Sequence, residues 1–75
     1  MRIKEVIQKT GLSRRTIQFY ISQKLITPKE DPVNGYHDFS DEDVRNLIII
    51  SRLRRLDFPV SDIRHILRFP GTASY

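Results

Sequence analysis

The 75-residue sequence predicts a mainly α-helical fold with four helices and a small two-stranded hairpin. Three observations support this fold class. Apolar residues recur at helical spacing in several segments, glycine and serine stand where helices would end or begin, and two prolines interrupt the periodicity near the middle of the chain. A chain of this length can build one hydrophobic core, so we expect a single domain.

The first helix is expected over residues 3–10, "IKEVIQKT", whose apolar residues repeat at helical spacing. It should end before Gly11, because glycine readily adopts the left-handed conformation that closes a helix. Ser13 can cap a second helix, expected over residues 14–24, by accepting a backbone N–H. Two helices joined by a tight turn that contains glycine make a helix-turn-helix.

The second helix is predicted to have an apolar face and a basic face. The residues expected to face the core are Ile17, Tyr20, Ile21 and Leu25, and those expected on the opposite side are Arg14, Arg15, Gln18 and Ser22. Arginine suits forked contacts with guanine or phosphate, and glutamine can form paired hydrogen bonds with adenine. In a helix-turn-helix the first turns of the second helix enter the DNA major groove. This end of the helix is therefore a candidate DNA contact.

The segment after the second helix is predicted to form the hairpin. Pro28 and Pro32 argue against a helix there, and we expect strands near 25–27 and 36–38. A proline has no N–H to donate to a strand, so a longer loop is preferred over a two-residue turn, with Gly35 shaping its exit. The tip of this loop is acidic.

Ser40 is predicted to open a long third helix, with Asp43 three residues later as its partner in a capping box. Pro59 and Ser61 mark the start of a short fourth helix. The apolar residues expected to pack in the core from this half of the chain are Phe39, Val44, Leu47, Ile48, Ile50, Leu53, Leu56, Phe58, Ile63, Ile66 and Leu67.

Charge is unevenly distributed along the chain, which has a formal net charge of +4. Basic residues dominate both ends, whereas residues 30–43 hold acids and no lysine or arginine. Clustered basic residues indicate a polyanionic partner such as nucleic acid or an anionic membrane surface. Long cationic side chains that simply solvate helix faces are the alternative explanation.

Composition argues against several other functions. No cysteine is present, which excludes disulfides and cysteine zinc sites, and His37 and His65 lack partners at metal-binding spacing, so no cofactor is expected. No apolar run approaches the roughly 18 residues of a membrane helix, and no secretory signal is recognisable. An enzyme is not expected either, since the sequence has no phosphate-binding glycine loop and no nucleophile–base pair at recognisable spacing.

Taken in order, these elements resemble the N-terminal winged helix-turn-helix DNA-binding domain of bacterial MerR-family transcriptional regulators, over residues 1–69. The resemblance rests on "IKEVIQKTGLSRRTIQFY", "LITP", "GYHDFSDEDV" and "LIIISRLRRLDFPVSDI". It implies a recognition helix in the major groove and a wing, formed by the hairpin, that contacts phosphates.

The resemblance also indicates the residues that would contact DNA, which are Arg14, Arg15, Thr16, Gln18, Tyr20, Tyr36 and His37. Some positions depart from the family's pattern. Gln18 and His37 each stand where arginine is common. The glutamine would change base preference, and the histidine would weaken binding by the wing. Phe19 stands where tyrosine is common, and Asp57 replaces the usual glycine between the third and fourth helices.

The resemblance further implies that the full-length protein is a homodimer in the cytoplasm. It would bind an inverted-repeat promoter operator, distort the DNA and act indirectly on RNA polymerase. By this analogy, residues 70–75 are a tail or linker to an absent dimerisation helix and effector domain, and the fragment alone would be monomeric. Two alternatives remain open. One is an excisionase-like architectural protein that bends DNA, and the other is a MerR-like protein-interaction module that does not bind DNA. The acidic wing favours the second, whereas Arg14 and Arg15 argue against it.

Overall fold

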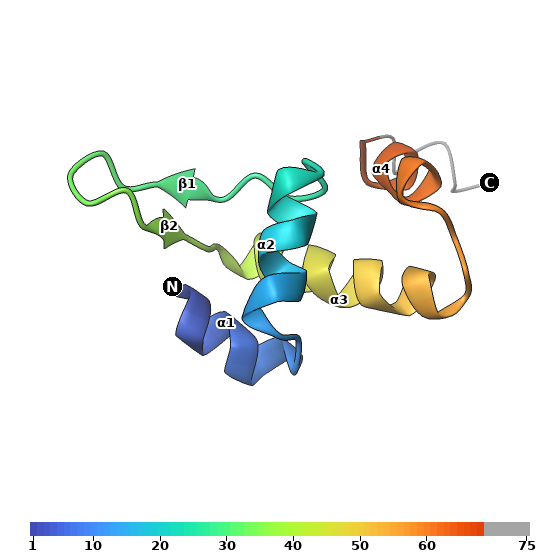
Figure 1. Cartoon of the computed structure of the whole chain (residues 1–75), viewed down its shortest axis with the longest axis horizontal. Coiled ribbons are helices and arrows are strands. Elements are labelled where there is room, and N and C mark those ends of the chain that lie inside the picture. Colours follow the sequence, from blue (N-terminus) through green and yellow to red (C-terminus); the bar gives the residue numbers. More distant parts are fainter. Residues whose placement is uncertain (69–75) are drawn as a thin grey trace.

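The computed structural model describes residues 1–68, in which four helices accompany one two-stranded antiparallel sheet (Figure 1). The elements are α1 (Ile3–Thr10), α2 (Arg14–Ser22), β1 (Lys29–Glu30), β2 (His37–Asp38), α3 (Asp41–Arg55) and α4 (Val60–Arg68). The hairpin projects to one side of α2, while most of α3 and the whole of α4 lie on the other side (Figure 1). The predicted fold class, mainly helical with a small two-stranded wing, is confirmed. The tail of residues 70–75 lies outside the described residues.

The turn between α1 and α2 forms through the two predicted capping residues. Gly11 adopts the left-handed conformation, with φ 74°, and its N–H donates to the carbonyl oxygen of Ile7. Ser13 caps α2, because its Oγ accepts the N–H of Thr16 at 3.1 Å. The helix ends at Ser22, earlier than expected.

The chain after α2 differs from the prediction, since the strand expected at 25–27 is wrong and β1 begins later. Lys24 has a left-handed backbone, with φ 59°. The N–H of Leu25 donates to the carbonyl oxygen of Tyr20 at 3.0 Å, which keeps this segment folded against the end of the helix. Leu25 and Ile26 are consequently buried in the core and take no part in the sheet.

The hairpin, which we call the wing, has only two residues in each strand. Its register places Lys29 opposite Asp38 and Glu30 opposite His37. Gly35 has φ 73° at the exit of the loop between the strands, as predicted. Because so short a sheet has little cohesion of its own, the wing depends on contacts with the rest of the domain.

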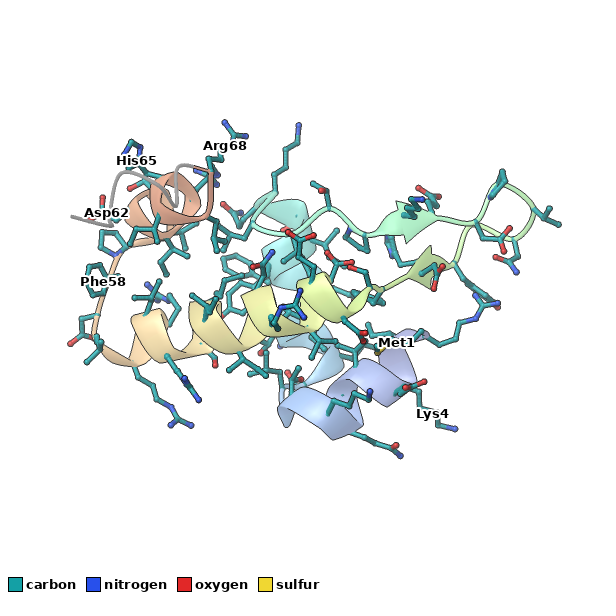
Figure 2. All side chains as sticks on the ribbon, turned by 180° about the vertical axis from the view of Figure 1, so that it is seen from behind. Met1, Lys4, Phe58, Asp62, His65 and Arg68 are labelled. Atoms are coloured by element: carbon teal, nitrogen blue, oxygen red, sulfur yellow. The ribbon has the colours of Figure 1, made fainter. Side chains whose placement is uncertain are left out.

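The start of the chain supports the base of the wing, and Figure 2 shows Met1 beside the beginning of α3. The N–H of Phe39 donates to the carbonyl oxygen of Met1 at 2.7 Å. The amino group of Met1 donates to the carbonyl oxygen of Phe39 and to Oδ1 of Asp38, each at 2.7 Å. Phe39 is buried, so this network ties the wing to the core.

Helix α3 begins with the predicted capping box. Oγ of Ser40 accepts the N–H of Asp43 at 3.1 Å, and Oδ2 of Asp43 accepts the N–H of Ser40 at 2.9 Å. Acidic residues occupy its first turn and arginines its last turn, which matches the direction of the helix dipole.

The core gathers buried residues from all four helices and from the segments on either side of the wing. These residues are Val6, Ile17, Tyr20, Leu25, Ile26, Phe39, Leu47, Ile50 and Ile63. Two core predictions are wrong, because Leu56 is 69% exposed and Phe58 is 36% exposed. Helix α3 ends before them, and Asp57, with φ 65°, redirects the chain toward α4.

No helix among residues 1–68 is both long and apolar enough to cross a membrane.

Candidate nucleic-acid interface

Helix α2 presents a polar face because its other face is held in the core. Ile17 and Tyr20 are buried, whereas Arg14, Arg15 and Gln18 are exposed. The helical period of 3.6 residues produces this division. Core packing therefore directs the basic side chains at the start of α2 toward solvent.

Two residues predicted to contact DNA, Thr16 and Tyr20, make contacts with other residues of the domain. Oγ1 of Thr16 accepts a hydrogen bond from Oγ of Ser13 at 2.9 Å, so its hydroxyl is part of the helix cap. Tyr20 is only 7% exposed, and its ring centroid lies 5.8 Å from that of Phe19. Phe19 is itself 48% exposed and packs only partly.

A groove of about 520 Å³ lies between the start of α1, the exposed face of α2 and the wing. Its lining residues are Arg2, Ile3, Lys4, Arg14, Gln18, Gly35, Tyr36 and His37. Four of the seven predicted contacts, Arg14, Gln18, Tyr36 and His37, thus meet in one place. Arg15 is exposed on α2 outside this lining. The lining carries three basic side chains and no carboxylate, so we call it the basic groove.

Arg2 and Lys4 line the basic groove, although sequence reasoning did not select them. The guanidinium carbon of Arg2 lies 5.0 Å from the ring centroid of Tyr36, which is the geometry of a cation–π contact. Figure 2 shows the side chain of Lys4 extending outward from α1. Their basic character was visible in the sequence, but their proximity to the wing depends on how the hairpin folds back toward α1.

The acidic residues of the wing line a different groove. Glu30, Asp31 and Asp38 line it together with Arg2, Lys29 and Pro32. The hydrogen bond from the amino terminus, followed by the charge of the same ammonium group, holds the pKa of the Asp38 carboxyl below its usual range. The acids of the wing are thus not part of the lining of the basic groove, although Arg2 lines both grooves.

Among residues 1–68, no group of three or more His, Cys, Asp or Glu side chains is arranged to hold a metal ion.

A protein-family model and two curated relatives match most of the chain. The model of the MerR HTH family of regulatory proteins matches residues 1–69. The chain is 33% identical over 67 residues to the HTH-type transcriptional regulator CueR of Yersinia pestis, covering 89% of this chain and 48% of that protein. It is 37% identical over 67 residues to HmrR of Rhizobium leguminosarum bv. viciae, covering 89% of this chain and 51% of that protein. The chain therefore spans about half the length of these curated relatives.

A solved structure shares the fold. The transcription regulator PbrR691 of Ralstonia metallidurans CH34, solved in complex with lead(II), superimposes with a TM-score of 0.84 and 24% sequence identity. The similarity covers all of this chain and 59% of that chain.

Proposed function

The chain belongs to the MerR family of helix-turn-helix regulatory proteins, and from this we propose that it binds duplex DNA through the basic groove and regulates transcription at a promoter. MerR-family regulators bind DNA and regulate transcription, and the relatives are named as transcriptional regulators, not enzymes. The observation that carries the proposal is the meeting of α2 and the wing in a groove lined by Arg2, Lys4 and Arg14 without any acid.

In the proposed complex, the start of α2 enters the major groove and the wing lies against the adjacent backbone. Arg14, Arg15 and Gln18 face the base edges or nearby phosphates, for which their forked donors and amide group are suited. Tyr36 and His37 contact the backbone beside them.

Thr16 and Tyr20 support helix α2 in this proposal. Thr16 supports the cap that starts α2, and Tyr20 fixes the helix to the core. The proposed DNA-binding site thus has five contact residues, Arg14, Arg15, Gln18, Tyr36 and His37, with Thr16 and Tyr20 supporting them.

At the level of the whole protein, we propose that residues 1–69 form the DNA-binding domain and that residues 70–75 lead to a dimerisation helix and an effector domain. The support is that the relatives are about twice as long as the matched segment. A homodimer would bind an inverted-repeat operator in the cytoplasm and distort it, which would affect RNA polymerase indirectly.

The proposal is tested by titrating the ¹⁵N-labelled 75-residue chain with mixed-sequence duplex DNA at low and moderate salt. We expect amide shifts at the start of α2 and at residues 35–37, and we expect them to weaken as salt rises, because phosphate contacts release counterions. The variant Arg14→Ala is expected to lose about 1–3 kcal/mol of binding free energy if the side chain reads a base. Arg45→Ala is the matched control, since Arg45 is exposed on α3 and does not line the basic groove.

Absence of shifts at low salt would contradict the proposal and would favour a protein-interaction module. Equal losses in the two variants would contradict docking through the basic groove, because net charge alone would then explain binding.

A further inference from the structure

Arg64 connects the last described helix to the carboxyl end of α2. Its Nε and Nη2 atoms both donate to the carbonyl oxygen of Gln23, at 3.2 and 2.7 Å. The two residues lie 41 positions apart in the sequence. Arg64 is half-buried, whereas Arg68, one turn later on α4, is exposed and points away from α3 (Figure 2).

The carbonyl of Gln23 is a group that needs a partner. The last carbonyls of a helix have no N–H to accept within the helix, and they carry its negative dipole end. Helix α2 has no basic residue in its own last turn. Just beyond it, the left-handed backbone of Lys24 turns the chain away. The guanidinium of Arg64 therefore supplies, from another helix, hydrogen bonds to this carbonyl and a positive charge close to the end of α2.

The contact between Arg64 and Gln23 also affects the orientation of the amino end of α2. Helix α2 contains nine residues, and its core contacts through Ile17 and Tyr20 lie between the two ends. Holding the carboxyl end therefore restricts the direction in which Arg14 and Arg15 point at the start. Two donors from one planar group converge on this single oxygen, which fixes their orientation better than one donor can.

We propose that Arg64 is a positioning residue for DNA binding, which sets the tilt of α2 through the carbonyl of Gln23 without touching the DNA. This inference rests on the proposed function. It predicts that α2 and α4 are coupled, so that a displacement of α4 changes how the start of α2 meets the major groove.

The test compares Arg64→Ala and Arg64→Lys with Arg68→Ala, which removes the same charge from the same helix. Each protein is titrated with the same duplex DNA at several salt concentrations, and its unfolding is followed in urea. We expect Arg64→Ala to lose about fivefold or more in affinity, because the side chains at the start of α2 become misaligned with the DNA groove. The dependence of affinity on salt should stay unchanged, because no phosphate contact is removed. Arg68→Ala should remain within about twofold of the parent chain at equal salt, since no contact with α2 is lost.

Arg64→Lys keeps the charge but not the fork, and it is expected to recover only part of the affinity. In the DNA-free proteins, amide shifts in Arg64→Ala should extend from residues 23–25 to the start of α2. If Arg64→Ala proves unfolded, Arg64→Lys carries the same comparison of affinity, salt dependence and amide shifts.

Three results would overturn the inference. An unchanged affinity would show that the contact does not position α2 for DNA. A salt slope lower by about one would identify Arg64 as a direct phosphate contact. If the urea data show that enough Arg64→Ala protein is unfolded without urea to account for the affinity loss, Arg64 only stabilises the fold. Failure of the proposed function is distinguished from these outcomes, because it appears in the titration of the unmodified chain.

Discussion

The guanidinium of Arg2 lies over the ring of Tyr36, with its carbon 5.0 Å from the ring centroid, and joins the start of α1 to the wing. Tyr36 is 63% exposed, so the contact lies at the surface. Both residues also line the basic groove. The contact therefore helps to hold the wing close to the start of α1 at the edge of this groove.

We expect Arg2 and Tyr36 to be energetically coupled. In a double-mutant cycle with Arg2→Gln and Tyr36→Leu, the coupling free energy should be about 0.5–1 kcal/mol, the range for an exposed cation–π contact. Urea denaturation of the four proteins measures it. Lys4→Gln combined with Tyr36→Leu serves as the control, and a coupling of equal size there would show that general charge effects are responsible.

The carboxyl of Asp38 is expected to titrate below its ordinary pKa, chiefly because the amino terminus donates a hydrogen bond to it and adds a positive charge. A folded-state pKa below the unfolded value means that this contribution to stability is present above the unfolded pKa. It is lost as pH falls through the folded-state pKa. Carboxyl-detected NMR titration measures the shift. Acetylation of the α-amino group should raise the pKa toward its ordinary value, and by more than Arg2→Gln does, since the charge of Arg2 is a smaller cause.

The capping box of α3 is expected to contribute measurably to stability. Ser40→Ala leaves the N–H of Asp43 without its acceptor, and such a loss typically costs about 1 kcal/mol. Ser61→Ala, at an exposed position within α4, provides a comparison for a serine without this role. Similar urea midpoints for the two variants would contradict the prediction.

Asp57→Gly is expected to stabilise the domain. Asp57 has φ 65°, a conformation that costs most residues about 1–2 kcal/mol, costs aspartate less and costs glycine little. The greater entropy of glycine in the unfolded chain offsets about 0.4–1 kcal/mol of that gain. Thermal unfolding should therefore show a modest rise in Tm, whereas Asp57→Ala should show none. A lower Tm for the glycine variant would mean that the aspartate side chain stabilises this turn.

The helices and their caps could be predicted because their signals are local. Ser13 and Gly11 each act on backbone groups within a few residues. The apolar residues of α2 repeat at helical spacing, which is visible directly in the sequence. The position of the first strand could not be predicted, because the apolar residues of "LIT" suit either a strand or an irregular segment that packs in the core. The hydrogen bond from Leu25 to Tyr20 decides between them in the structure.

The predicted contacts on α2 and the wing follow from the same local reasoning, and the basic groove brings four of them together. What the sequence did not reveal are the links between distant segments. Arg2 meets Tyr36, and Arg64 meets Gln23, only after the wing and α4 have packed. Each arginine could equally have been a solvated surface residue until the fold was known.

The loop of the wing also bears on how the protein ages. An asparagine followed by glycine deamidates when the glycine nitrogen attacks the side-chain carbonyl carbon and a succinimide forms with release of ammonia. In the folded loop, the N–H of Gly35 donates to the carbonyl oxygen of Asp31 at 2.8 Å, and Oδ1 of Asn34 accepts the N–H of Tyr36 at 3.0 Å. The attacking nitrogen is thus engaged by another partner, and the side chain of Asn34 is held in one orientation. Peptide mapping after prolonged incubation is expected to find isoaspartate at position 34 in urea but little under native conditions, and equal amounts would contradict this protection. Protection of Asn34 by the folded wing would preserve the DNA-binding surface, because each deamidation adds a negative charge next to the basic groove.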